Sequence, residues 1–329
     1  MNKLENKIKN FIKKHELIPE NSKIVLGLSG GPDSIFLLHF LAQLKQEGLI
    51  KEIIAAHLDH GWREESAKEA QFCAEMAKKY NVGFVARKLS DLQLNLKFEG
   101  SKEDLGRKYR RHLFELVKKE HNFDLIALAH HAQDQEETFF IRLIRGASLS
   151  GLTAIKPKTG FYIRPLLEIN KPEILEFLDL NKIPYVTDPS NMSHEFLRNR
   201  IRELVIPELK KCDSRFEQNF KVTINRLQET EEFLEQLTRE KFSEISREIS
   251  GVFYINLNQL FNLHNIMLYR VLVYWLIKQN VKFPSGQSFL DEIIKFLAQP
   301  DGVGSKEHAL YQNWSIIKKK NLAHISVKQ

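Results

Sequence analysis

The stretch LSGGPDSIFLL, residues 28–38, decides the fold. It follows an apolar run, KIVLGLS at 23–29, and leads into residues 34–48, whose apolar side chains are spaced as on a helix. Gly30 and Gly31 allow the backbone to turn sharply between strand and helix and to approach a ligand closely. N–H groups at a helix start lack intrahelical partners and carry partial positive charge, so this strand, loop and helix suit a phosphate.

The loop contains one acid, Asp33, which is unexpected beside a phosphate. Phosphate oxygens would repel a carboxylate, but a magnesium ion between the two removes the repulsion. The loop lacks the Gly-Lys-Ser/Thr ending of a Walker A sequence and does not match the dinucleotide fingerprint. We therefore expect a different phosphate cradle, in which Asp33 holds magnesium or orients a leaving group; the alternative is an ordinary acid in the first turn of a helix.

Strand-like and helical segments alternate through the first half of the chain. After residues 23–29, strand-like runs recur at 52–58, 82–89 and 123–130, with helical patterns at 64–81, 101–121 and 134–147. This alternation predicts an α/β fold with a doubly wound parallel sheet covered by helices on both faces. Ligands of such sheets bind at the carboxyl ends of the strands. Unusual polar residues follow three of these strands, at 29–34, 57–63 and 130–134.

The pattern changes near residue 214. Residues 214–245, 262–280 and 285–299 read as helices, and the tail at 308–327 alternates as strands do. We expect a catalytic domain at 1–213 and, at 214–329, a mostly helical second domain that ends in a small strand-rich tail.

Composition narrows the class of protein. Of 329 residues, 43% are apolar and 28% charged, as in ordinary globular proteins. Cys73 and Cys212 form no CxxC pair, which argues against a disulfide framework or a zinc ribbon and favours the reducing cytoplasm. No run of roughly 20 apolar residues occurs, so we expect no membrane partner. The formal net charge of +7 fits either a polyanionic partner or a lysine-rich solvated surface.

The loop resembles that of a known superfamily. SGGPDS is similar to the PP-loop of the ATP pyrophosphatases, which split ATP into AMP and pyrophosphate. Further motifs resemble those of the tRNA(Ile)-lysidine synthetases, in the same order over about residues 22–210: AHLDHGWREES at 56–66, AHHAQDQEETFFIRLIRGASLSGL at 129–152, IRPLL at 163–167 and DPSNMSHEFLRNRIRELVIPEL at 188–209.

This resemblance implies a two-step ligation. ATP would first adenylate the ring carbonyl oxygen of the wobble cytidine in an isoleucine tRNA with a CAU anticodon. The ε-amine of free lysine would then displace AMP, which gives lysidine. The implied cofactors are ATP and Mg²⁺, and the implied partners are tRNA(Ile) and free L-lysine; the resemblance also permits a homodimer.

The resemblance also implies roles for particular residues. Those expected to bind ATP are Ser29, Gly30, Gly31, Pro32, Asp33, Ser34 and His57. Those expected to be catalytic are Asp33, His131, Asp134 and Arg198, with Asp33 and Asp134 as the magnesium ligands. Asp134 would bind the metal or handle the lysine amine, which must lose a proton to attack. Arg198 would contact the AMP phosphate or the charge of the transition state, and Glu137 has the alternative role of a helix-capping acid.

Contact with tRNA is expected from arginines. The expected residues are Arg107, Arg110, Arg111, Arg200 and Arg202, with a solvated basic face as the alternative. Lys318, Lys319, Lys320 and Trp314 are further candidates, whereas Trp275 has the setting of a core residue.

Two other functions compete with this interpretation. Another PP-loop tRNA-modifying enzyme, such as a tRNA thiolase, would commonly use paired or catalytic cysteines, and Cys73 and Cys212 are poorly placed for that. A protein that binds tRNA and nucleotide without catalysing a reaction would be expected to lack the acidic residues of the site, yet Asp33 and Asp134 are both present.

Overall fold

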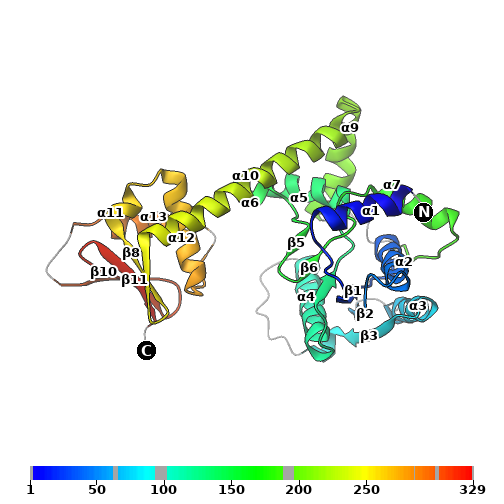
Figure 1. Ribbon diagram of the computed structural model, residues 1–329. Helices are drawn as coiled ribbons and strands as arrows, with labels where there is room; N and C mark the ends of the chain where they lie inside the picture. Colours follow the sequence, from blue (N-terminus) through cyan, green and yellow to red (C-terminus); the bar gives the residue numbers. More distant parts are fainter. Residues whose placement is uncertain are drawn as a thin grey trace. The chain divides into compact units, whose positions relative to one another are not determined.

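The computed structural model describes residues 3–61, 66–92, 102–187, 196–284, 286–300 and 304–327. The chain forms two compact units, Met1–Leu227 and Gln228–Gln329 (Figure 1). The division falls within one long helix, α10 (Phe216–Ile245). A functional boundary near residue 214, where this helix begins, stays a prediction.

The first unit is built on a six-stranded sheet, which confirms the predicted α/β class. Its strand order is β3 (Gly83–Lys88), β2 (Glu52–Asp59), β1 (Lys23–Gly27), β4 (Leu125–Ala127), β6 (Tyr162–Ile163) and β5 (Lys158–Thr159). Neighbouring strands from β3 to β6 are parallel, and β5 pairs antiparallel with β6. The strand order reverses direction between β1 and β4, so the crevice outside their carboxyl ends is where such a sheet binds ligands.

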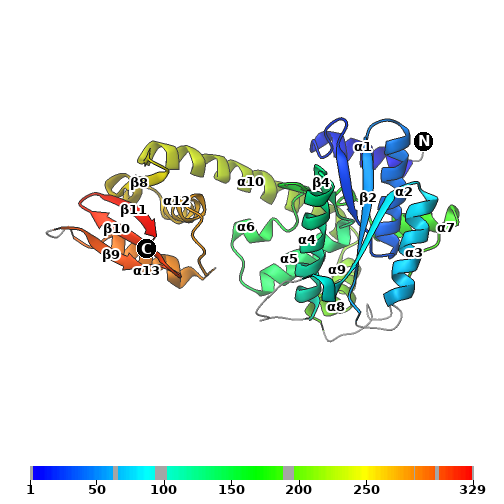
Figure 2. The ribbon, with the colours of Figure 1, turned by 90° about the horizontal axis from the view of Figure 1, so that it is seen from below.

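Helices cover both faces of this sheet (Figure 2). The helices of this unit are α1 (Lys3–Lys14), α2 (Pro32–Gln46), α3 (Ser66–Lys79), α4 (Lys102–Glu120), α5 (Ala132–Ile144), α6 (Leu149–Leu152), α7 (Lys171–Leu180), α8 (Leu197–Arg200) and α9 (Ile206–Cys212), with a 3-10 turn η1 (Leu89–Asp91) and a π turn η3 (Ile201–Val205). One core cluster joins α1, α2, α3 and α7 to one face, and another joins α4 to the opposite face.

Strand β1 shows why its sequence is continuously apolar. Ile24 and Leu26 pack into the core on one face of the sheet, whereas Val25 packs with α4 on the other, and all three are fully buried. Successive side chains of a strand point to opposite faces, so a strand covered on both faces needs apolar residues at every position. Burying one such side chain stabilises the fold by about 1.5–3 kcal/mol.

The second unit has its own core and an antiparallel sheet. The strand order is β7 (Ser246–Ile249), β8 (Val252–Asn256), β11 (Leu322–Val327), β10 (Trp314–Lys319) and β9 (Lys306–Ala309). Helices α11 (Leu257–Phe261), α12 (Asn265–Lys278) and α13 (Gln287–Leu297) complete it. The sheet therefore includes two strands before α11 as well as the predicted tail. Trp275 is a core residue, as expected, and its ring N–H donates to the Phe253 carbonyl at 3.2 Å.

One candidate for RNA contact is buried in this unit. The ammonium of Lys318 donates to the carbonyl of Leu297, at 2.8 Å, and to that of Gln299, at the end of α13. Lys319 and Lys320 are exposed. Alternation along β10 explains the difference, because Lys318 falls on the face that packs on the core, where a cation favourably caps the helix carboxyl end. Within the described residues, no helix has the length and apolar character needed to cross a membrane.

Gly27, at the end of β1, should not tolerate a side chain. A Cβ there would lie 2.8 Å from the ring of Phe114 in α4, so we expect Gly27→Ala to lower the free energy of unfolding by about 1–3 kcal/mol. Gly83→Ala is the matched control, because its Cβ would find its nearest neighbour at 3.4 Å. Urea denaturation compares the two; equal stability of both variants would contradict the close packing of β1 on α4.

Candidate active site

The loop between β1 and α2 is shaped by one glycine. Gly30 has φ +84°, in the left-handed region that favours glycine, and a Cβ there would lie 3.3 Å from the Cys73 sulfur. Its carbonyl accepts from the Val186 N–H at 2.9 Å. A backbone hydrogen bond from Val186 and close packing against Cys73 therefore both hold the sharp turn in place.

Two serines close the loop on itself. The Ser34 hydroxyl donates to the Gly31 carbonyl at 2.9 Å and accepts from the Ser29 N–H at 3.2 Å. The Ser29 hydroxyl lies 3.0 Å from that of Ser34 and accepts from the Gly31 N–H at 3.4 Å. Pro32 begins α2, where its fixed φ suits a first helical residue. The result is a compact turn placed over a helix amino end.

His57 lies behind this loop. It is buried in β2, and its Nδ1 is 2.9 Å from the Leu28 carbonyl. The imidazole therefore anchors the junction of β1 and the loop, and contact with a nucleotide from this position would use the backbone. Asp59 accepts from the Gly61 N–H at 2.9 Å. The rest of the motif at 62–65, and the DPSN sequence at 188–191, lie outside the described residues.

Residues about 100 positions apart meet beside the loop. His131 directly precedes α5, and its Nε2 lies 3.8 Å from Asp33 Oδ2 and 3.6 Å from Asp134 Oδ2. Asp134 Oδ2 accepts from the His131 N–H at 2.9 Å, as a capping acid does at a helix start. Because β1 and β4 are adjacent and parallel, the segments that follow them converge at one edge of the sheet.

An ion cluster around the buried Glu137 lies next to these acids. Arg198 donates to Asp134 Oδ1 at 2.8 Å and to Glu137 Oε2 at 2.5 Å. Arg202 donates to Glu137 Oε1 at 2.5 Å. Glu137 has no exposed surface, so it is the shared partner of two arginines rather than a helix cap. Residues four apart share one helix face, which places Arg198 and Arg202 together and Arg200 on the exposed side.

The electrostatic setting keeps Asp134 ionised. Burial alone would raise its pKa, but electrostatic interactions with His131, His130 and Arg198 and the hydrogen bond from the His131 N–H hold that pKa below the usual range. Burial lowers the pKa of His130 to about 4, so this imidazole is neutral at pH 7. A carboxylate with a lowered pKa is a weak base and a good partner for a cation.

The acids suit a magnesium ion in part. Asp33 Oδ1 is buried and makes no hydrogen bond to any described residue. Mg²⁺ commonly uses one or two carboxylates together with phosphate oxygens and water. No group of three or more His, Cys, Asp or Glu side chains among the described residues is arranged to hold a metal. Asp33 and Asp134 therefore fit a metal ion that arrives with a phosphate ligand.

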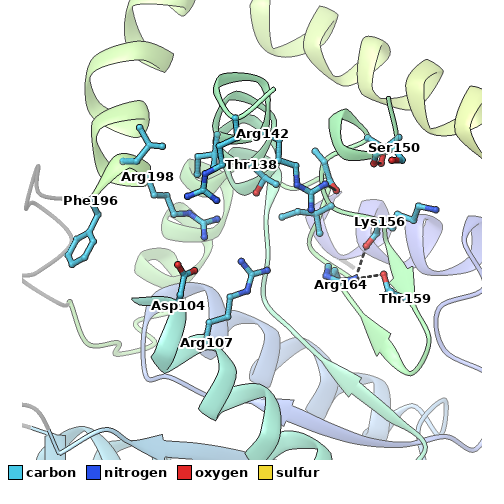
Figure 3. Close-up of a pocket in the computed structure, with 16 residues that line it drawn as sticks. Asp104, Arg107, Thr138, Arg142, Ser150, Lys156, Thr159, Arg164, Phe196 and Arg198 are labelled. Carbon is cyan, nitrogen blue, oxygen red and sulfur yellow. Dashed lines mark hydrogen bonds between the residues drawn. The ribbon is translucent and has the colours of Figure 1, made fainter. Parts of the chain in front are cut away.

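A basic cavity of about 830 Å³ opens next to the ion cluster (Figure 3). One acid, Asp104, lines it together with six cations: Arg107, Arg142, Arg145, Lys156, Arg164 and Arg198. Burial, and then nearby Arg107 and Arg111, lower the pKa of Arg164 to about 10. Such a concentration of like charge in a cleft attracts a polyanion.

Hydrogen bonds hold two of these arginines in place. Arg164 donates to the Lys156 carbonyl at 2.8 Å and to the Thr159 hydroxyl at 3.3 Å (Figure 3). Arg142 donates to the carbonyls of Gly151 and Ala154, both at 2.7 Å. The backbone therefore fixes part of the cationic lining before any ligand arrives.

The arginines expected to bind RNA lie in different places. Arg107 lines the cavity, Arg110 is half-buried on α4, and Arg200 is exposed. Arg111 lies 4.9 Å over the ring of Tyr162 and donates to Glu115 at 3.1 Å. Arg142, Arg145 and Arg164, which also line the cavity, were not among the residues expected to bind RNA. Their sequence positions could have indicated this role, because all three lie inside the motifs at 129–152 and 163–167.

Comparisons with known proteins show which family the chain belongs to. The family model of the PP-loop domain matches residues 1–209. The tRNA(Ile)-lysidine synthase of Bacillus cereus (strain ATCC 10987 / NRS 248) is 34% identical over 244 residues, 73% of this chain and 51% of that protein. The Bifunctional protein TilS/HprT of Listeria innocua serovar 6a is 37% identical over 242 residues, 72% of this chain and 37% of that protein. The chain thus spans about half the length or less of these curated relatives.

A solved structure shows the same fold. The U34-tRNA thiolase NcsA from Methanococcus maripaludis matches with a TM-score of 0.58 and 20% identity, over 69% of this chain and 80% of that one. At this identity the likeness supports the fold alone.

Loss of the Glu137 charge should destabilise the first unit. In Glu137→Gln, two arginines would face each other without their carboxylate, so we expect the free energy of unfolding to fall by about 3 kcal/mol. The control is Glu208→Gln, which breaks an exposed pair with Lys211 and should change stability by less than about 0.5 kcal/mol. Similar losses in chemical denaturation for the two variants would contradict the central role of Glu137.

His130 should make stability depend on pH. Its pKa is about 4 in the folded protein and 6.5 ordinarily, so between these values the unfolded chain binds the extra proton. Stability is therefore lost as pH falls from about 6.5 towards 4, by up to about 3 kcal/mol. Denaturation curves of His130→Gln over this range should show a smaller loss; curves parallel to those of the wild type would exclude the effect.

Proposed function

The chain belongs to the PP-loop domain family, and from this premise we propose that it ligates free lysine to the wobble cytidine of tRNA(Ile) with a CAU anticodon. The observation that carries the proposal is the similarity to lysidine synthases across a region whose separate motifs meet at one site. His131 lies near Asp33 of the loop and near Asp134, and Asp134 is paired with Arg198, so three motifs are in contact. PP-loop domains of this family bind ATP, and ATP is the expected energy source.

The first step is adenylation. The cytidine carbonyl oxygen attacks the α-phosphorus of ATP, the bond to the β-phosphate breaks and pyrophosphate leaves. Ser29, Gly30, Gly31, Pro32 and Ser34 surround the pyrophosphate, and the amino end of α2 faces its charge. Asp33 and Asp134 would hold Mg²⁺, and this ion would supply positive charge to offset that of the leaving group.

The second step joins lysine to the ring. The ε-amine loses a proton and attacks the activated ring carbon, and the carbon–oxygen bond breaks to release AMP. Arg198, fixed by Asp134 and Glu137, is placed to contact the AMP phosphate. His131, between two carboxylates, is our candidate for the proton acceptor. Asp134, with its lowered pKa, holds a cation: the metal ion or the incoming ammonium.

The basic cavity is the proposed entry for RNA. Arg107, Arg142, Arg145 and Arg164 are spaced around a volume that suits an unstacked nucleotide and its phosphates. Arg200 is exposed and is a further candidate for RNA contact, and Arg111 and Arg202 form ion pairs with Glu115 and Glu137. The proposed substrates place the reaction in the cytoplasm. A homodimer remains a separate prediction.

A thiolase reaction fits the site less well. Cys73 is fully buried, and burial raises the pKa of its thiol to about 12, so it does not supply a thiolate at neutral pH. Cys212, at the end of α9, is exposed and stands apart from the PP-loop in the sequence.

Incubation with ATP, Mg²⁺, labelled lysine and tRNA(Ile) bearing a CAU anticodon tests the function. We expect lysine-dependent release of AMP and label retained on the RNA. AMP release without labelled RNA would contradict the proposal.

Substitution of Asp33 tests the site. Asp33→Asn removes the proposed metal ligand and should lower the rate of lysine incorporation by a factor of about 100 or more, with little change in the melting temperature. Asp179→Asn, an exposed change on α7, is the matched control. Turnover of Asp33→Asn close to that of the control would exclude the proposed role.

A further inference from the structure

Lys171 reaches the PP-loop from a distant part of the chain. Its Nζ lies 2.5 Å from Asp33 Oδ2, across 138 positions of sequence. The two side chains are partly shielded, with exposed fractions of 32% and 23%. An ion pair this accessible to water contributes little to stability. Stabilising the fold is therefore a poor explanation for the position of Lys171 beside Asp33, the proposed metal ligand.

The backbone around Lys171 is firmly placed. Lys171 begins α7, and its N–H donates to the side chain of Gln133, in α5, at 2.9 Å. The Ala132 N–H at the start of α5 donates to the Ile169 carbonyl at 2.9 Å. The first turns of α5 and α7 are thus bonded to each other, and the Lys171–Asp33 pair links them to the first turn of α2.

This arrangement gathers positive potential around Asp33. Three helix amino ends, of α2, α5 and α7, converge there, together with the ammonium of Lys171. His131 lies in the same place; its side chain is 9% exposed, and its Nδ1 makes no hydrogen bond to any described residue. Asp33 Oδ1 is likewise buried and without a hydrogen bond to the described residues. The helix amino ends and Lys171 can bind an anion, and Asp33 can bind a cation, so this set of groups suits an anion and a cation that bind together.

We propose that Lys171 is a pyrophosphate-binding residue that exchanges partners with the metal. Without nucleotide, its ammonium neutralises Asp33. When ATP binds with Mg²⁺, the metal replaces the ammonium on Asp33, and Lys171 turns to the β- and γ-phosphate oxygens, which need a cation as pyrophosphate leaves. The inference rests on the proposed use of ATP but does not depend on which acceptor receives the adenylyl group.

The exchange predicts opposite changes in two affinities. In Lys171→Met, Asp33 loses its competing cation, so nucleotide-free protein should bind Mn²⁺, used as a probe visible by electron paramagnetic resonance, about tenfold more tightly. The same variant should bind ATP·Mg²⁺ about tenfold more weakly, because one phosphate contact is lost. Adding Asp33→Asn to Lys171→Met should abolish the gain in Mn²⁺ affinity.

Two controls separate this role from a structural one. Lys221→Met removes another lysine–carboxylate pair of the first unit, with Glu168 at 2.6 Å, and should change neither affinity. Lys171→Arg keeps the positive charge and should recover most of the affinity for ATP·Mg²⁺. A lower melting temperature of Lys171→Met with both affinities unchanged would overturn the inference.

Lysine footprinting of the wild type gives a test that needs no variant. Acetylation of Lys171, followed by mass spectrometry, should slow in the presence of ATP·Mg²⁺ or pyrophosphate with Mg²⁺, and not with AMP, which lacks the β- and γ-phosphates. Equal protection by AMP, or no protection by any of the three, would contradict the proposed contact. If the wild type bound no ATP at all, the proposed function would fail instead.

Discussion

The rest of the site depends on the ion pairs that the buried Glu137 carboxylate forms with Arg198 and Arg202. A fully buried carboxylate is costly unless cations and hydrogen bonds compensate it, and here Arg198 and Arg202 do so together. Their pairing holds α8 and η3 against α5. Arg198 then has an N–H left for Asp134, which caps α5 beside His131. The places of Asp134 and Arg198 near the PP-loop thus follow from one ion cluster.

Charge is divided on the two sides of Arg198. The acids Asp33 and Asp134 lie on the side of the PP-loop, whereas arginines line the cavity on the other, and Arg198 belongs to both. Under the proposed reaction, ATP and tRNA both carry phosphates, whereas free lysine carries none. Cations are then needed wherever phosphate lies, and acids only where a metal ion or an ammonium group binds. The observed division of charge meets this requirement apart from Asp104, the one acid among the six cations of the cavity, and Arg198 stands where ATP and tRNA would meet.

The three arginines of RNRIR show where local sequence patterns stop being informative. Their spacing indicates that they cannot all point the same way, but not which of them turn inward. The answer depends on Glu137, more than 60 positions earlier in the chain. The lysines at 318–320 are a similar case. They look equivalent in sequence, yet the register of β10 on its core buries the first and exposes the other two.

The sequence by itself determined the parallel sheet, the PP-loop and the identity of most charged residues around it. These features are local, since apolar periodicity specifies strands and helices, and Gly30 with Ser34 specifies the turn. Only the tertiary structure decided which residues meet. It bound Lys171 to Asp33, placed the imidazole of His57 behind the loop, and joined arginines of separate motifs in one cavity. The reason is physical: these contacts arise where the starts of α2, α5 and α7 and the ends of β1 and β4 pack at one edge of the sheet, and no local pattern encodes that packing.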